Sequence, residues 1–179
     1  MEWFASDAFD GRPGARRARR AVSKPAAPSG ERSGGVQWLS DLIRLEIVLW
    51  ERVDARLREQ HDLPLAFFEP LHFIEHSPDG GLRIGDLAQA LQITVGGTSK
   101  LADRIERAGL IRREPDPDDR RASRVALTES GRRTLAAAVK TYEAELAGIL
   151  DPELDEEEQR AMHDLVTRLL VATGDGEPA

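Results

Sequence analysis

The sequence predicts a mainly α-helical fold with one small β-hairpin near its middle. Apolar residues recur every three or four positions through most of residues 36–172. Two short segments of this kind meet at a two-residue turn, and an alternating, turn-rich stretch follows them between residues 111 and 128. A chain of 179 residues with 40% hydrophobic content can bury one core, so we expect one domain, at residues 36–172, with terminal tails.

Residues 1–35 form the first segment, and their composition predicts disorder. They are rich in Gly, Pro, Ser, Ala and Arg and show no sustained period. A basic cluster lies within them, at Arg16, Arg17, Arg19 and Arg20. It is interpreted either as an arm for DNA phosphates or as a solvated tail without function.

Two helices are expected next, at residues 36–60 and 63–75. The apolar surface of the first is wider than one small core requires, with Leu39, Leu42, Ile43, Ile47, Trp50, Val53 and Leu57 at helical spacing. The second is expected to begin near Pro64, because proline is favoured at the first helical position. Pro70 lacks a backbone donor and should kink or interrupt it.

Two short helices follow a turn at residues 77–81, namely Ile84–Leu91 and Thr94–Ala108. Thr94 is expected to cap the second helix, and Gly109 to end it in the left-handed conformation. Its core-facing stripe is expected to comprise Thr98, Leu101, Ala102 and Ile105. Two short helices on such a tight turn form a helix-turn-helix.

Two strands are expected after these helices, at residues 111–114 and 123–128. The second strand places Val125 and Leu127 on one face and Arg124 and Ala126 on the other. The connection PDPDDRRA contains two prolines, which cannot donate ladder hydrogen bonds. Pairing should therefore stop there, and the tip of the hairpin should project.

The predicted tip carries charged residues that suit a DNA minor groove. Arg120 and Arg121 supply guanidinium groups of the kind that narrow minor grooves attract. Asp118 is spaced to hold Arg120 in a fixed geometry. The alternative interpretation is a solvated surface loop with ion pairs.

Two more helices complete the predicted fold. Thr128 is expected to cap a helix that runs to about Leu150, and Asp151-Pro152 breaks the chain. Asp155, with Glu158 three residues later, predicts a capping box at the start of the last helix, and residues 173–179 read as a tail. The helices at 36–62 and 132–172 carry more apolar surface than the DNA module can cover, which predicts a homodimer with recognition helices roughly 34 to 36 Å apart.

The exposed face of the 94–108 helix is small, hydroxylic and basic. Gly96 and Gly97 each cost roughly 1 kcal/mol of helix propensity, which favours a surface approached closely by another backbone. Residues 82–131 are therefore predicted to be the DNA-binding lobe of a winged helix-turn-helix. The predicted DNA-binding residues are Thr94, Val95, Gly96, Gly97, Ser99, Lys100 and Arg104 from the helix, and Asp118, Arg120, Arg121 and Arg124 from the hairpin.

The runs LADRIERAGLIRR and DPDDRRASRVALTESG resemble the recognition helix and wing of the multiple antibiotic resistance regulator (MarR) family, and the likeness extends from about Val36 to Leu170. This resemblance implies a dimeric transcription factor, usually a repressor, that commonly releases DNA when a small ligand or an oxidant acts on it. By position, Asp118 and Arg120 match the family's wing pair, and residues 94–100 match its groove-reading turn. Arg83 departs from the family, in which a hydroxyl residue often opens the first helix of the motif, so this helix is expected to be poorly capped.

Composition narrows the function further. The absence of cysteine excludes disulfides, cysteine-ligated zinc and a thiol-oxidation switch. No apolar run is long enough to span a bilayer or to act as a signal peptide, so a cytoplasmic protein without membrane contact is expected. The net charge of −7 is uneven: residues 82–133 hold eleven basic and eight acidic side chains, whereas residues 143–164 hold nine acids and one arginine. This separation of basic and acidic segments would orient the protein on a duplex.

An effector pocket is predicted between the first helix, the second helix and the helix after the hairpin. Its aromatic and titratable candidates are Trp38, Trp50, Phe67, Phe68, His72 and His76. Aromatic side chains with a few polar groups would suit a small aromatic or anionic effector, a preference that is partly implied by the resemblance to the MarR family. Ordinary core packing is the alternative for most of them.

Two other function classes were weighed. An enzyme would have to use His72 and His76, which have the i, i+4 spacing of metal ligands, but no H-E-x-x-H motif is present. We therefore predict no catalytic residues, no cofactor and no metal. A winged helix that binds only proteins is the second alternative. Lys100, Arg120 and Arg121 argue against it, because the centres of protein interfaces tend to be depleted of charged residues.

Overall fold

The computed structural model describes residues 35–116 and 123–173, and within that part of the chain it confirms a mainly helical fold with a small antiparallel sheet. The elements in order are α1 (Gly35–His61), α2 (Leu65–Glu75), β1 (Gly81–Arg83), α3 (Ile84–Ala90), α4 (Val95–Arg107), β2 (Ile111–Pro115), β3 (Ser123–Leu127), α5 (Glu129–Leu150) and α6 (Glu156–Ala172). The predicted arginine cluster at residues 16–20 and most of the predicted C-terminal tail lie outside the described residues.

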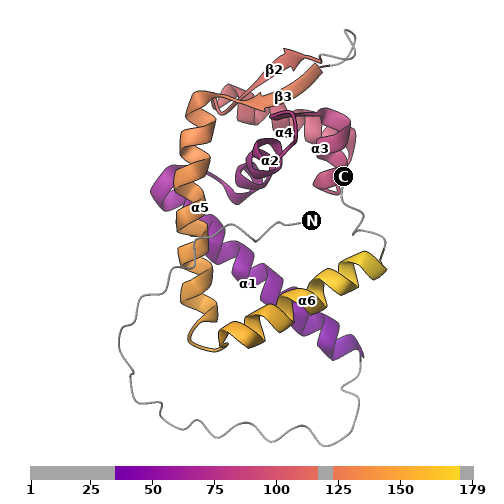
Figure 1. Ribbon diagram of the computed structural model, residues 1–179, viewed down its shortest axis with the longest axis vertical. Helices are drawn as coiled ribbons and strands as arrows, with labels where there is room; N and C mark the ends of the chain where they lie inside the picture. Colours follow the sequence, from indigo (N-terminus) through magenta and orange to yellow (C-terminus); the bar gives the residue numbers. More distant parts are fainter. Residues whose placement is uncertain (1–34, 117–122, 174–179) are drawn as a thin grey trace, which may run out of the picture.

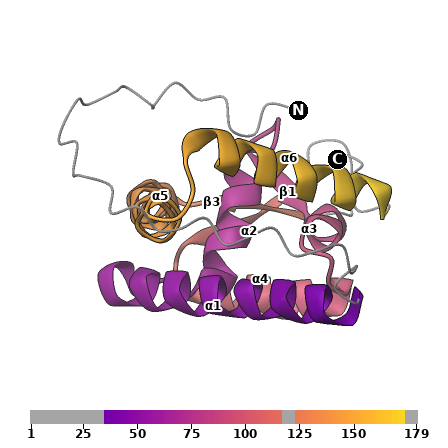
Figure 2. The same cartoon turned by 90° about the horizontal axis from the view of Figure 1, so that it is seen from below.

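The helices and the sheet divide the molecule into two ends (Figure 1). One end holds α2, α3, α4 and the sheet, and the other holds most of α1 together with α6. The long helix α5 runs between these ends and packs against α1. Seen from below, α1 and α6 lie on different sides of the molecule, so their overlap in Figure 1 is not a contact (Figure 2).

The sheet has the strand order β1-β3-β2, with both pairings antiparallel. We did not predict β1, because three residues are too few to show an alternating pattern. Its presence makes β3 the central strand, and this explains why Ala126 is buried although it faces away from Val125 and Leu127. Pairing also reaches one residue further than predicted, since Pro115 opposes Ser123 at the end of the edge strand β2.

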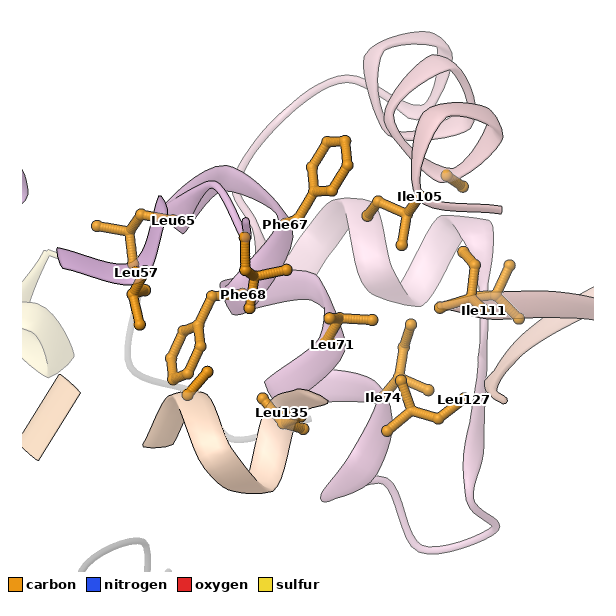
Figure 3. Close-up of a cluster of buried hydrophobic side chains, with 14 of the residues drawn as sticks. Leu57, Leu65, Phe67, Phe68, Leu71, Ile74, Ile105, Ile111, Leu127 and Leu135 are labelled. Atoms are coloured by element: carbon orange, nitrogen blue, oxygen red, sulfur yellow. The ribbon is translucent and has the colours of Figure 1, made fainter. Parts of the chain in front are cut away.

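The hydrophobic core is built around α2 (Figure 3). Its buried side chains meet residues from the far end of α1, from α4, from β2 and β3, and from the start of α5; the labelled members are Leu57, Leu65, Phe67, Phe68, Leu71, Ile74, Ile105, Ile111, Leu127 and Leu135. This one cluster fixes the short helices and the sheet relative to α5. The surface that α4 presents to solvent is therefore held by a packed core.

Helix α2 begins near Pro64 as predicted, although Pro64 is not its first helical residue, and the predicted interruption at Pro70 is not found. Pro64 takes the N-cap position, with φ −62° and ψ 143°, and the helix begins one residue later at Leu65. Pro70 does not interrupt α2, which is continuous to Glu75. The ring of Pro70 is buried in the core, and the carbonyl that its missing N–H would have met belongs to Ala66, an exposed residue that water can reach.

The start of α5 fits tightly against the corner between α4 and β2. The hydroxyl of Thr128 accepts a hydrogen bond from the N–H of Gly131 and donates to the carbonyl of Gly109, at 2.9 and 2.7 Å. A Cβ atom at Gly131 would lie 2.0 Å from the carbonyl oxygen of Leu110. Only glycine fits at residue 131, which gives Thr128 and Gly131, both in the DPDDRRASRVALTESG run, a packing role.

Candidate nucleic-acid interface

The turn between α3 and α4 is short and sharply defined. Gln92 adopts a left-handed conformation with φ 54°, and the N–H of Ile93 bonds the carbonyl of Ala88 at 3.1 Å. A non-glycine residue in this region costs roughly 1 kcal/mol or more, so the packed core must hold it. The helix α3 has no side-chain cap at Arg83, as predicted.

Both ends of α4 carry the predicted signals. The Thr94 hydroxyl accepts a hydrogen bond from the N–H of Gly97 at 3.1 Å, and Gly109 follows the helix with φ 74°. Thr98, Ala102 and Ile105 are fully buried. The buried stripe of α4 is therefore confirmed, with Leu101 at its partly buried margin.

The opposite face of α4 is open to solvent. Val95 is 58% exposed, and Lys100 and Asp103 are also exposed, whereas Ser99 is half-buried. A Cβ atom added at Gly96 would meet no heavy atom within 4 Å among the described residues. Nothing inside this part of the chain thus requires glycine at residue 96, so its propensity cost is not explained by intramolecular packing.

Arg104, a predicted DNA-binding residue, lies at the margin of this face. Its guanidinium carbon sits 5.3 Å from the centre of the Phe67 ring, a cation–π contact between α4 and α2. Phe67 was predicted as a ligand-binding residue. The structure instead places it in the core beneath Arg104.

The strands of the hairpin are tied to α4 by Arg113. Its guanidinium pairs with Asp103, and with Glu106 at 3.4 Å, while its backbone N–H bonds Glu106 at 3.0 Å. These contacts join the solvent-facing side of α4 to β2. Asp103, an acid on the face predicted to meet DNA, is thereby paired with an arginine.

Arg124, which we predicted to bind DNA, makes contacts within the sheet region. Its guanidinium lies 3.9 Å from Glu114 and donates to the carbonyl of Asp79 at 3.3 Å. The side chain is 20% exposed. Asp118, Arg120 and Arg121, the other predicted hairpin residues, lie outside the described residues.

An ion pair that we did not predict spans the sheet. Arg83 donates through Nε and Nη2 to the two carboxylate oxygens of Asp116, at 2.6 and 2.8 Å, and the Asp116 side chain is only 5% exposed. Because Arg83 ends β1 and Asp116 directly follows β2, the pair links the two edge strands across β3. The only sequence signal was the arginine at a position where the family often has a hydroxyl residue.

The predicted effector residues fall into separate groups. Phe68 stacks on His72 and on Tyr142, with ring centres 5.9 and 5.1 Å apart, and His72 lies 4.2 Å from His76. Tyr142 of α5 was not among our candidates. Trp38 is 55% exposed near the start of α1, about 28 Å along the helix from the core residue Leu57.

Trp50 is also separate from the Phe68 group. It lines a surface hollow on α1 together with Glu46, Ile47 and Glu51. The six predicted effector residues therefore do not line one common pocket in the described structure. Trp50 and Trp38 lie instead on the exposed apolar surface of α1.

Burial perturbs the titratable groups beside Phe68. It lowers the pKa of His72 to about 4, and the neighbouring His76 adds to this shift. Burial also raises the pKa of Glu69 and of Tyr142, for which the charge of Glu69 contributes. At neutral pH, His72 is therefore an uncharged ring in a mainly aromatic setting.

In residues 35–116 and 123–173, no group of three or more His, Cys, Asp and Glu side chains is placed to hold a metal ion. None of the helices in those ranges has the length and apolar character of a membrane span.

Comparison with known proteins agrees with this geometry. A sequence model of the MarR family matches residues 61–122, from the end of α1 into the hairpin. An uncharacterised helix-turn-helix-type transcriptional regulator of Bacillus cereus is 32% identical over 84 residues, covering 47% of this chain and 55% of the relative. The aligned part of the chain thus spans about half the length of the curated relatives that it matches.

Solved structures share the fold over a longer stretch. The MarR family regulator Sco3205 of Streptomyces coelicolor, solved in complex with DNA, superposes with a TM-score of 0.70 at 23% identity, over 83% of this chain and 92% of that one. The MepR–DNA complex of S. aureus gives a TM-score of 0.64 at 26% identity, over 80% of this chain and 99% of that one. With its capped α4 and its three-stranded sheet, the described chain has the fold of MarR family regulators, and residues 61–122 match the MarR family in sequence.

Proposed function

We propose that this chain is a sequence-specific DNA-binding transcriptional regulator that acts as a homodimer and represses by occupying a promoter. The observation that carries the proposal is the open face of α4, where the described chain leaves Gly96 uncovered and Val95 and Lys100 are exposed. Short side chains there let a recognition helix sit deep in a major groove. Two structural relatives with this fold were solved bound to DNA, which supports the proposal.

Within this proposal, residues 82–131 form the DNA-binding lobe. Direct contacts to DNA are assigned to Thr94, Val95, Gly96, Gly97, Ser99 and Lys100 of α4 and to Asp118, Arg120 and Arg121 of the wing, with Arg104 at the margin. Arg124 keeps only a supporting role here, because its side chain is mostly buried and engaged within the sheet region. Since the partner is chromosomal DNA, we place the protein in the cytoplasm.

Homodimerisation is supported by apolar surface that the described chain leaves uncovered. In α1, the exposed apolar residues continue from Val36 to Trp50. In α6, none of the residues is buried by the rest of the described chain, and Met162, Leu165, Val166, Leu169, Leu170 and Val171 are exposed. An apolar surface of this extent is typical of subunit interfaces. We therefore assign dimerisation to residues 36–62 and 132–172.

We place the effector site at the group around Phe68, His72 and His76. Aromatic rings and a neutral imidazole at this place suit a small aromatic molecule. The group lies between α2 and α5, and α5 leads from the wing to the proposed dimer interface. A ligand there would favour release if it bound more tightly to the dimer with a different spacing of its recognition helices.

A salt titration with one lysine variant and a matched control tests the DNA-binding assignment. Affinity of the full-length chain for a duplex that it selects from a random library is measured by fluorescence anisotropy at several salt concentrations. Lys100→Ala should weaken binding and reduce the salt slope by about one for each phosphate that the lysine neutralises. Lys140→Ala removes the same charge from the exposed surface of α5. It should change neither value at protein concentrations at which sedimentation shows the variant to be dimeric. Equal behaviour of the two variants would contradict the assignment of α4.

A further inference from the structure

We propose that Val95 reads the C5-methyl group of a thymine, so that the first turn of α4 recognises DNA through an apolar contact. This inference rests on the proposed function and specifies its ligand. It assigns a base-reading role to Val95, whose side chain is 58% exposed. Ile93, in the turn that precedes α4, is 45% exposed.

The hydroxyl groups of Thr94 and Thr98, at the start of α4, form hydrogen bonds within the chain. The Thr94 oxygen accepts the N–H of Gly97 at 3.1 Å as the helix cap. Thr98 is fully buried, and its hydroxyl donates to the carbonyl of Thr94 at 3.1 Å. Gly96 and Gly97 have no side chain. Val95 is therefore the one side chain of the first turn that projects into solvent without an internal hydrogen-bonding role.

The space beside Val95, at Gly96, is left open by the described residues. A Cβ atom at Gly96 would meet nothing within 4 Å in the described chain, so a partner surface can approach the valine closely from that side. The exposed Lys100 lies five residues further along α4 and supplies positive charge for a phosphate. An apolar group with a small neighbour and a nearby cation matches a major groove, whose edges are polar except at the thymine methyl.

The methyl group of thymine separates it from the other three bases in the major groove. Adenine, guanine and cytosine present donors and acceptors in the major groove, whereas thymine adds a methyl group. Burying one methyl-sized group against Val95 should change affinity by about fourfold. A dimer with two half-sites makes the contact twice, so about ten- to twentyfold is expected for the whole site.

The test exchanges single methyl groups on the DNA. The full-length chain first selects a duplex from a random library, and each thymine of the selected site is then replaced in turn by deoxyuridine, which lacks only the methyl. One thymine in each half-site should show weaker binding on replacement, about fourfold for one exchange and ten- to twentyfold for both. At this position, 5-methylcytosine should also bind more tightly than cytosine.

Two protein variants connect this effect to the valine. Val95→Ala should discriminate less than the wild type between the thymine and the deoxyuridine duplexes at that position, and alanine at an exposed helix start should leave the fold intact. Ser99→Ala is the control, because it should keep the full discrimination between the two duplexes whatever its overall affinity. If Val95→Ala discriminates as well as the wild type, or if no thymine responds to the exchange, the inference is wrong while the proposed function stands. If the chain selects no duplex at all, both fail together.

Discussion

Gly96→Ala should make the protein more stable and its DNA complex weaker. An alanine in a helix is favoured over glycine by up to about 1 kcal/mol. At residue 96 the added methyl meets no heavy atom within 4 Å of the described chain, so no steric cost reduces the gain. The position lies in the first turn of α4, where we expect a gain of about 0.5 to 1 kcal/mol in the free energy of unfolding.

The same methyl group should hinder the approach of DNA. If the backbone of α4 at Gly96 lies against base edges, an added Cβ must push the helix out of the groove. Overpacking by a methyl-sized group typically costs about 1 to 3 kcal/mol, which corresponds to roughly 5- to 150-fold in the dissociation constant. Stability and affinity should therefore change in opposite directions, as is common at functional sites.

The assay combines urea unfolding at a fixed protomer concentration with anisotropy on the selected duplex. Gly148→Ala is the matched control, because this helical glycine of α5 also has no atom of the described chain within 4 Å of an added Cβ. Gly148 lies in the segment assigned to dimerisation, so the affinity of this variant is compared at protein concentrations at which sedimentation shows it to be dimeric. There it should show the stability gain and an unchanged affinity. Should Gly96→Ala gain stability and bind DNA as tightly as the wild type, the account of why glycine occupies residue 96 would be refuted.

Three further predictions concern the core, the sheet and the proposed interface. The folded chain keeps His72 neutral down to a pKa of about 4, whereas the unfolded chain protonates it near 6.5, so folding stability should fall as pH drops through this window. The full pKa shift would correspond to about 3 kcal/mol in the free energy of unfolding, and solvent screening of the half-buried ring reduces the expected decrease to about 1 to 2 kcal/mol. In urea unfolding, His72→Gln should lose less stability than the wild type between pH 6.5 and 4. An identical pH profile for the two proteins would contradict the burial argument. Arg83→Ala removes the two guanidinium hydrogen bonds to the buried Asp116 carboxylate and should destabilise the fold by about 2 kcal/mol. Arg83→Lys should recover only part of this lost stability, as measured by the urea midpoint. No change in either variant would show the pair to be dispensable. Leu165→Glu puts a charge on the exposed apolar face of α6 and should weaken self-association at least tenfold in sedimentation equilibrium without lowering helix content; an unaltered dimer would remove α6 from the interface.

Local signals explain most of what the sequence predicted correctly. The caps at Thr94, Thr128 and Asp155 each depend on residues two or three positions apart, and all three appear in the structure. The left-handed Gly109 is likewise a property of one residue in its immediate context. Helix α4 was predictable because its start, its buried stripe and its end are encoded within a short segment.

Contacts between distant segments explain what sequence reasoning missed. Arg83 and Asp116 are 33 positions apart, and Asp116 reads as an ordinary turn residue until β1 and β2 are known to flank the same strand. The helical spacing of Tyr142 indicated only that it faces the core. Its stacking on Phe68 depends on how α5 crosses α2. Trp38 was grouped with Phe68 because both are aromatic, but α1 extends far beyond the core.

The central claim is that two copies of this chain bind one duplex through paired recognition helices. Selection of bound DNA by the full-length chain from a random library, followed by mass measurement of the complex, tests it most directly. We predict an enriched inverted repeat whose half-site centres lie about 10 base pairs apart, occupied by two protomers. Recovery of no sequence above the starting library, or of a single protomer on an asymmetric site, would contradict the account.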